Sequence, residues 1–160
     1  MDIAIESADA ADPDKLRAFL VKAWQSEVVV AHGDRLHPAR LPGFVAMASG
    51  HIVGHASYRT ADGACEVTSI AADPRRRGIG SQLMAAVIGE ARRRGCHRVW
   101  LTTTNDNLDA LRFYQRRGFR LTKLRTGAVD QARAALKPEI PTIGSHGIRM
   151  RDELDLEFSL

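Results

Sequence analysis

The spacing of apolar residues over the middle of the chain predicts three consecutive β-strands. The stretches "GFVAMAS" and "HIVGHASYRT" are separated only by Ser49-Gly50, a pair typical of tight turns, and together they indicate a β-hairpin. A second turn at Ala61–Gly63 leads into "ACEVTSIAAD", which is again rich in strand-forming residues. Strands joined by such short turns pair antiparallel. The chain is therefore expected to contain an antiparallel meander.

Immediately after this meander the apolar spacing becomes helical. Apolar residues recur every three or four positions from Gly78 to Arg94, and Gly95 ends the pattern. The next stretch, "CHRVWLTTT", predicts another strand. Because a strand–helix–strand unit returns the chain in the same direction, Glu66–Asp73 and Cys96–Thr104 are predicted to be parallel neighbours in a mixed sheet. The predicted fold class is α+β, or mixed α/β.

Other segments add helices and strands at both ends of the chain. Ile3 and Ile5 alternate with polar residues and predict a short strand, and Asp12 followed by Pro13 predicts the start of a helix. Residues 25–41 fit no single element. Downstream, the predicted order is a helix, a strand, a short helix, a loop and a closing strand, over "NLDALRFYQRRG", "FRLTKLRT", "GAVDQARAALKP", "EIPTIGSHG" and "ELDLEFSL".

The composition indicates a single globular domain over residues 1–160. Hydrophobic residues make up 44% and charged residues 26% of the chain, which is ordinary for a soluble domain. No apolar run approaches the roughly 20 residues needed to cross a bilayer, so we expect no membrane partner. The acidic N-terminal stretch "MDIAIESADAADPDK" lacks the pattern of a secretory signal, and we expect a cytoplasmic location.

Neither the cysteines nor the histidines have the spacing of a metal site, so we expect no bound metal. Cys65 and Cys96 lie outside any CxxC motif and are interpreted as free thiols. The histidines are interpreted as structural or surface residues: His32, His37, His51, His55, His97 and His146.

The stretch "DPRRRGIGSQLMAAV" (Asp73–Val87) places three arginines and two glycines at the start of a predicted helix. A helix N-terminus has unpaired N–H groups and the positive end of the dipole, which favour an anion. Gly78 and Gly80 allow the backbone to approach a ligand, and arginine pairs well with phosphate. The stretch is neither a Walker A loop nor a GxGxxG dinucleotide motif. It predicts a phosphate or diphosphate site, although a basic surface turn has the same residues.

A second motif follows in "NDNLDALRFYQRRGFR" (Asn105–Arg120), which contains N-x-x-A-x-x-F-Y and then Gly-Phe. Asn107 and Tyr114 are two helical turns apart and share one face of the predicted helix. With the RxxGxG turn before it and a strand between, the sequence resembles the GCN5-related N-acetyltransferase (GNAT) superfamily. The resemblance covers Ile3–Leu160 in outline, and its specific part is Glu66–Phe119.

The resemblance implies a GNAT-type central mixed sheet of about seven strands, mostly antiparallel and flanked by helices. It also implies a V-shaped splay between two parallel strands, close to a bulge in the first of them that would fall near Ile70–Ala72. It names acetyl-CoA as the acyl-donor cosubstrate, with the diphosphate on the amides of Arg77–Ser81. Tyr114 would point at the thioester sulfur. The implied cofactor-binding residues are Ile70, Ala71, Ala72, Arg75, Arg77, Gly78, Ile79, Gly80, Ser81, Asn107 and Tyr114.

One residue departs from the family pattern. Pro74 stands directly before Arg75, whereas many relatives carry a proline further from the arginine. The turn is then shaped differently, which leaves open which of Arg75, Arg76 and Arg77 contacts phosphate.

Acetyl transfer to a primary amine needs a proton acceptor for the amine and a proton donor for the departing thiolate. A lysine-like amine with a pKa of ~10.4 is almost fully protonated at neutral pH, and Glu66 is the candidate general base. Tyr114 is the candidate general acid because a phenol with a pKa of ~10 holds its proton at pH 7. A backbone N–H near Ala71–Ala72 would stabilise the oxyanion. We expect direct attack in a ternary complex, without an acyl-enzyme.

Simpler interpretations stay open beside these roles. Tyr114 also suits an amphipathic core position, Glu66 an ordinary strand carboxylate, and Asn107 a helix cap. For the whole protein, the alternatives are transfer of a longer acyl group and a non-catalytic acyl-CoA sensor. We expect no nucleic-acid partner, because the net charge is only +4 and aromatic residues make up 6% of the chain.

The resemblance places the amine acceptor pocket in Gln25–Leu41 and Lys137–Asp152. The second region, "KPEIPTIGSHGIRMRDE", mixes acidic and basic residues. It selects neither a small-molecule amine nor a protein amino group as the acceptor. Family habit suggests a homodimer.

Overall fold

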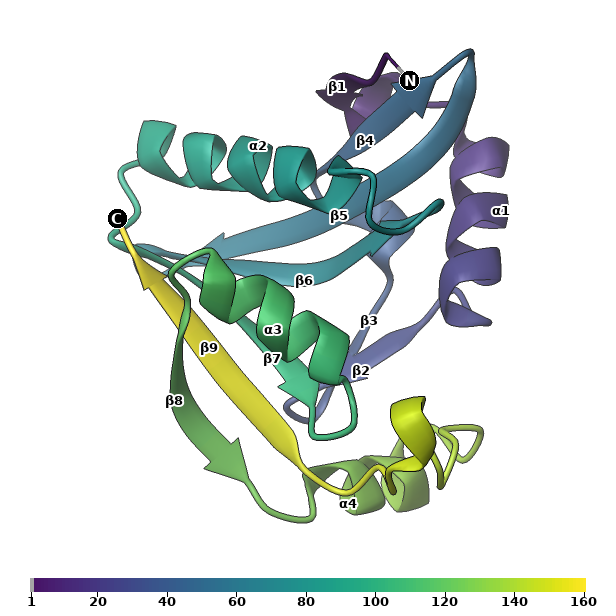
Figure 1. Ribbon diagram of the computed structural model, residues 1–160, viewed down its shortest axis with the longest axis vertical. Helices are drawn as coiled ribbons and strands as arrows, with labels where there is room; N and C mark the ends of the chain where they lie inside the picture. The colour runs from purple at the N-terminus through teal and green to yellow at the C-terminus, as the bar shows by residue number, and fades with distance from the viewer. Residues whose placement is uncertain (1) are drawn as a thin grey trace. The chain divides into compact units, whose positions relative to one another are not determined.

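The computed structural model describes residues 2–160, and these form two compact units (Figure 1). The first unit comprises the residues up to Val29, then His37–Val99 and Leu160. The second comprises Val30–Leu36 and Trp100–Ser159. No helix within residues 2–160 is long and apolar enough to cross a membrane. Each unit is described on its own below.

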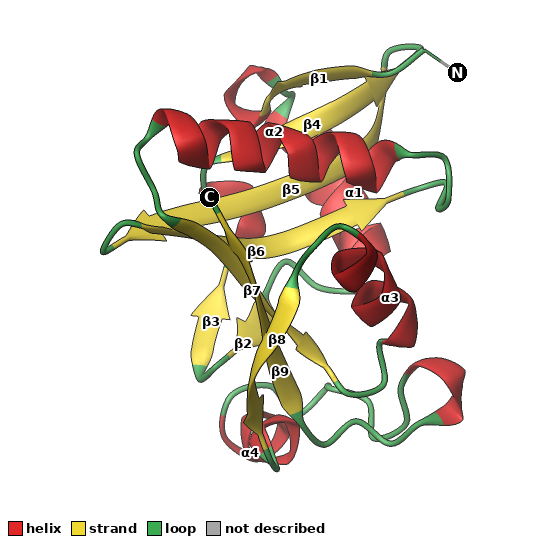
Figure 2. Cartoon of the chain, turned by 60° about the vertical axis from the view of Figure 1, so that its left-hand side comes forward, coloured by secondary structure: helices red, strands yellow, loops and turns green. Residues whose placement is uncertain are grey.

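The first unit contains the predicted meander, extended by one strand. Its strands are adjacent in the order β1-β4-β5-β6, and each pair of adjacent strands is antiparallel. Two α-helices belong to it, and in Figure 2 α2 runs in front of these strands and α1 behind them. The bounds are β1 (Ala4–Ser7), α1 (Pro13–Trp24), β4 (Gly43–Ala48), β5 (His51–Ala61), β6 (Ala64–Ala72) and α2 (Ile79–Arg93), with short 3₁₀ turns at Ala8–Ala10 and Pro38–Arg40.

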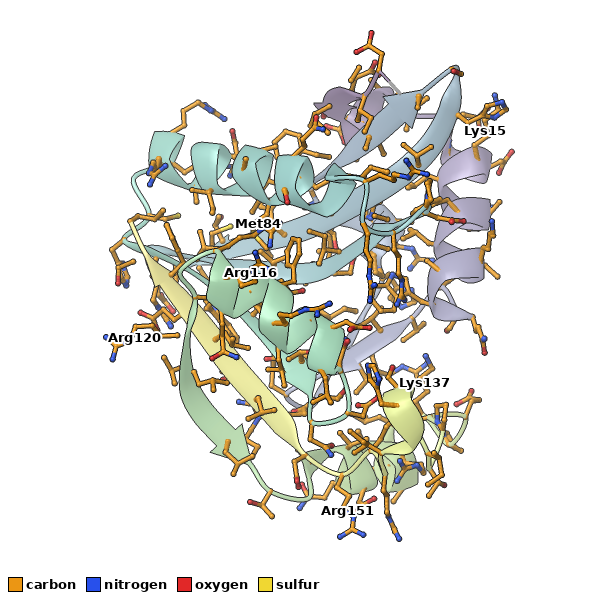
Figure 3. The ribbon with its side chains drawn as sticks, in the orientation of Figure 1. Lys15, Met84, Arg116, Arg120, Lys137 and Arg151 are labelled. Carbon is orange, nitrogen blue, oxygen red and sulfur yellow. The ribbon has the colours of Figure 1, made fainter. Side chains whose placement is uncertain are left out.

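Each helix of this unit packs on its own face of the sheet. Leu16 and Leu20 of α1 form a buried cluster with Val45 of β4. On the other face, a Cβ atom at Gly54 would lie 2.6 Å from the Ile79 side chain of α2, so only glycine allows the helix this close. Met84 of α2 is 1% exposed and points toward the sheet (Figure 3). The predicted start of α1 is confirmed, since the Asp12 side chain accepts hydrogen bonds from the first turn.

The register of β5 and β6 changes by one residue within the meander. Ser57 is paired with Ser69, whereas the next residue, Tyr58, is paired with Val67. Thr68 is the extra residue, so the bulge of β6 lies there. The bulge was expected near Ile70–Ala72, and it lies two residues before Ile70. Its position coincides with a buried hydrogen bond between the Ser57 and Thr68 hydroxyl groups.

The second unit is a three-stranded sheet with two α-helices and a small hairpin. Its strands are adjacent in the order β7-β9-β8, and β8 pairs antiparallel with the closing strand β9. The hairpin turns at His32 and Gly33, which both have positive φ, and it occupies the region where the sequence predicted no single element. The bounds are β2 (Val29–Ala31), β3 (Asp34–Leu36), β7 (Arg98–Thr104), α3 (Leu108–Arg116), β8 (Arg120–Arg125), α4 (Ala128–Ala135) and β9 (Glu153–Ser159).

The two units together confirm the predicted mixed α+β class. Among the described residues, four sheet strands of the first unit and three of the second make the expected seven, and four α-helices accompany them. The predicted strand, helix and strand after the meander are β6, α2 and β7.

Candidate active site

The loop between β6 and α2 ends in a glycine that has no side chain to cap the helix. Gly78 is the N-cap of α2 and has φ +77°, a conformation that favours glycine. A Cβ atom at Gly78 would meet nothing within 4 Å, so the loop faces open space there. Arg75, Arg76 and Arg77 are all exposed just before it. The predicted anion site thus has an accessible helix N-terminus and three exposed cations.

The residues on either side of this loop fix its position. Ile79 is 1% exposed and anchors the first turn of α2 in the core, while Gly80 and Ser81 are half-buried in the same turn. At the other end, Asp73 N donates to Val53 O, and Lys22 of α1 makes an ion pair with the Asp73 carboxylate at 2.7 Å. Ile70, Ala71 and Ala72 are half-buried and close β6 just before the loop. These predicted cofactor residues therefore form one continuous segment.

Glu66 lies near the opposite end of β6 and is already paired. Its side chain is buried, and its Oε2 accepts a hydrogen bond from Nε of Arg59 on β5 at 2.6 Å. Arg59 is directly opposite Glu66 in the β5–β6 register. A guanidinium at this distance stabilises the charged carboxylate. Glu66 can act as a base only in competition with that ion pair.

Tyr114 is buried on α3 among aromatic rings. The Phe113 ring contacts it edge-on at 5.3 Å between centroids, and Phe119 lies at 5.7 Å. Burial raises the pKa of Tyr114 above its usual value. The hydroxyl therefore keeps its proton at neutral pH, and it is a weaker acid than a solvated phenol.

Asn107 begins the helix that carries Tyr114. Its Oδ1 accepts a hydrogen bond from Ala110 N at 3.3 Å, so its predicted role as a helix cap is confirmed.

Cys65 is fully buried, and burial raises its pKa to about 12. A thiol with this pKa is uncharged at neutral pH and is a poor nucleophile.

The comparison with known families identifies the chain. Residues 8–119 match the model of the acetyltransferase (GNAT) family. The chain belongs to the GNAT family. Two Bacillus subtilis proteins are similar to it over most of its length. YdhI is 38% identical over 141 residues, which cover 87% of each chain. YxbD is 37% identical over 142 residues, which cover 88% of this chain and 89% of YxbD.

Solved structures show the same GNAT fold. An acetyltransferase of Bacillus subtilis in complex with CoA has a TM-score of 0.78 at 23% identity, over 99% of both chains. A GNAT family acetyltransferase of Elizabethkingia anophelis with acetyl-CoA bound has a TM-score of 0.73 at 22% identity, over 99% of this chain and 98% of its own. An IAA acetyltransferase of Bacillus cereus has a TM-score of 0.75 at 20% identity, over 99% of this chain and 100% of its own.

The GNAT match ends at Phe119, and the sequence interpretation missed the residues that organise the chain beyond it. Asn105 Oδ1 accepts from the backbone N–H groups of Arg151 and Asp152, at 2.9 and 3.0 Å. Asp106 is buried, and its Oδ2 accepts from Ser145 N at 2.8 Å. Three consecutive Asx residues after a strand, in "TNDN", are the signal that was available for this role.

Two carboxylates of β9 hold the β2–β3 hairpin and strand β8. The backbone N–H of His32 donates to both oxygens of the buried Glu153 at 3.1 Å. Arg125 of β8 donates to Glu153 at 3.2 Å and makes a two-point contact with Asp155. Arg35 of the hairpin donates to Leu136 O at 2.8 Å. Residues of the predicted acceptor region Gln25–Leu41 thus contact Glu153 and Leu136. Residues of the other predicted acceptor region, Lys137–Asp152, contact Asn105 and Asp106. All of these contacts lie within the second unit.

Proposed function

We propose that this GNAT protein transfers an acetyl group from acetyl-CoA to a primary amine by direct attack in a ternary complex. The acceptor is a small-molecule amine or a protein amino group. The observation that carries the proposal is the N-terminus of α2, which has a glycine N-cap without a capping side chain, open space in front of it and three exposed arginines. These features suit a diphosphate. Neighbours of the same fold with CoA or acetyl-CoA bound support this choice of anion.

The binding residues follow from this placement. The backbone amides of residues 77–81 would hold the diphosphate, and Arg75 and Arg77 would supply charge. Ile70–Ala72, at the end of β6, would present backbone groups to the pantetheine arm as an adjacent strand would. Asn107 would contribute from the start of α3, in addition to its role as a cap. Acetyl-CoA would supply the activated thioester.

The chain's own residues would then move two protons. Glu66 would accept the proton of the amine, directly or through water, in competition with its ion pair to Arg59. Tyr114 would donate its proton to the departing thiolate; its burial keeps that proton in place until the transfer. A backbone N–H near Ala71–Ala72 would stabilise the oxygen that becomes negatively charged. The uncharged thiol of Cys65 supports direct transfer without an acyl-enzyme. A homodimer in the cytoplasm stays part of the proposal.

Calorimetric titration of CoA and acetyl-CoA tests the binding site. Gly80→Glu places a carboxylate in the first turn of α2, and we expect micromolar binding by the wild type to be lost because the charge repels the diphosphate. Gly89→Glu is the matched control. It adds the same charge to the same helix, where a Cβ atom meets nothing within 4 Å. Equal binding by the two variants, or none by the wild type, would contradict the proposal.

The release of CoA in the presence of a panel of amines tests catalysis. Tyr114→Phe removes only the hydroxyl, and we expect kcat to fall about 100-fold with the Kd of CoA unchanged, as for loss of a general acid. Binding without turnover of any acetyl, propionyl or longer acyl donor would favour the non-catalytic acyl-CoA sensor instead.

A further inference from the structure

Two neighbouring strands hold most of the buried polar side chains of the molecule. Burying a polar group costs free energy unless it is hydrogen-bonded, so sheets seldom concentrate such groups in one place. Five of the seven buried polar or charged residues described here lie on β5 and β6: His55, Ser57, Glu66, Thr68 and Ser69. Departures from apolar packing of this kind are expected at functional sites.

Three of these five residues form a hydroxyl cluster at the bulge of β6. Ser57 Oγ lies 2.7 Å from Thr68 Oγ1 and 2.6 Å from Ser69 Oγ. Ser57 is fully buried, and Thr68 and Ser69 are each 7% exposed. One hydroxyl group on β5 therefore binds Thr68, the extra residue of the bulge, and Ser69, the residue that follows it. Solvent does not compete with these two hydrogen bonds.

The bulge that holds the hydroxyl cluster determines where the rest of β6 points. A bulge bends its strand and re-aims the side chains that follow, and a shift of one residue turns every side chain to the other face. Only Ile70, Ala71 and Ala72 separate the hydroxyl cluster from the loop between β6 and α2. The orientation of these three residues therefore depends on keeping Thr68 as the extra residue.

We propose that Ser57 is a positioning residue for the acyl-CoA arm. Through Thr68 and Ser69 it fixes the bulge of β6, and the bulge fixes the backbone groups of Ile70–Ala72. This inference rests on the proposed function, in which those backbone groups hold the pantetheine arm. Ser57 itself contacts neither the cofactor nor the reacting atoms. Its two hydrogen bonds set the geometry of the residues that do.

Substitutions that separate the hydroxyl group from side-chain volume test this role. Thr68→Val keeps the shape of the side chain and removes its hydroxyl, whereas Thr68→Ser keeps the hydroxyl and removes a methyl group. Ser57→Ala removes both hydrogen bonds at once. For each variant, we would measure the Kd of CoA by calorimetry, the KM for acetyl-CoA, kcat, and the thermal midpoint.

We expect Thr68→Val to raise the Kd of CoA and the KM for acetyl-CoA about tenfold, the effect of losing about one buried hydrogen bond, and Ser57→Ala, which removes two, to raise them at least as much. Thr68→Ser should stay within about twofold of the wild type, because its hydroxyl still binds Ser57. We expect kcat to change less than KM, since the catalytic groups are untouched. If Ser57→Ala does not fold, the Thr68 pair decides.

Four outcomes would overturn the inference. Lower thermal midpoints with an unchanged Kd would reduce the cluster to a structural role. Equal losses in Thr68→Ser and Thr68→Val would assign the effect to packing of the methyl group. Failure of the wild type to bind CoA would overturn the proposed function and this inference together, whereas tight binding by the wild type and all variants would overturn this inference alone.

Discussion

In the second unit, buried carboxylates join segments that are far apart in the chain, whereas in the first unit the buried polar groups lie along two adjacent strands. Asp106 and Glu153 accept hydrogen bonds from the backbone of Ser145 and His32, respectively. In the first unit, the ring nitrogens of His55 have no hydrogen-bond partner among the described residues, although the side chain is fully buried. The two units thus use buried polarity for different purposes.

The difference has a direct energetic meaning. A buried carboxylate that accepts backbone N–H groups stabilises the loop that supplies them, and its own desolvation is offset. The desolvation of a buried imidazole without a hydrogen-bond partner is not offset in this way, and it destabilises the fold. Polar burial in the second unit therefore serves structure. Along β5 and β6, the unpartnered ring of His55 costs stability, whereas Ser57, Thr68 and Ser69 are hydrogen-bonded to one another.

Acid titration of stability gives the largest expected effect of this difference. Burial lowers the pKa of His55 from 6.5 to about 4, so the folded state favours the neutral ring. Its contribution to stability is complete above pH 6.5 and is lost as the pH falls through the window from 6.5 to 4. By pH 5 the loss reaches about 2 kcal/mol and approaches about 3 kcal/mol at lower pH.

The variant His55→Met isolates this term, because it has a similar volume and cannot titrate. We expect it to be more stable than the wild type in urea at pH 7.5, since it removes an unpartnered polar group. The advantage should grow by about 2 kcal/mol between pH 7.5 and pH 5. A constant difference across this range would show that His55 is not a desolvated neutral imidazole.

Removal of a carboxylate in the second unit should have the next largest effect. Asp106→Ala leaves Ser145 N without its acceptor, and we expect a loss of about 2 kcal/mol in urea unfolding. Trypsin should then cleave faster at Arg149 and Arg151, because the segment loses one of its attachments. Asp109→Ala is the control, since Asp109 lies in the first turn of α3, is 42% exposed, and is only 3.5 Å from His146 in an exposed pair that contributes little to stability. The Kd of CoA should stay unchanged in both; a large loss of CoA binding in Asp106→Ala would contradict the separation of roles.

These two regions also differ in how far the sequence predicts them. The turn into α2 was predicted in detail because its determinants are local: two glycines, three arginines and a helical apolar pattern within Asp73–Val87. The β2–β3 hairpin was missed because each strand has only three residues and its anchor, Glu153, lies 121 residues from His32. No local sequence pattern predicts a hydrogen bond between residues so far apart in the chain.

Between these extremes lie features that the sequence contained but the interpretation did not use. Counting back from the turn at Asp62-Gly63 places Arg59 opposite Glu66, so the ion pair of the candidate base was predictable from hairpin register. The position of the bulge was not, because a single extra residue leaves the apolar pattern of β6 almost unchanged. It depends on Ser57 of the neighbouring strand, which sequence spacing alone does not connect with Thr68.

The smallest expected effect concerns the ion pair that joins α1 to the loop between β6 and α2. Lys22 and Asp73 are only 2.7 Å apart, and their side chains are 75% and 53% exposed. Lys22→Met should cost no more than about 0.5 kcal/mol in urea unfolding, because solvent and salt screen an exposed pair. The loop is instead held by Ile79 in the core and by the bond from Asp73 N to Val53 O. Urea unfolding of both proteins at 20 mM and 500 mM salt checks this, and a loss comparable to that of Asp106→Ala would mean that surface charge, not burial, holds the loop.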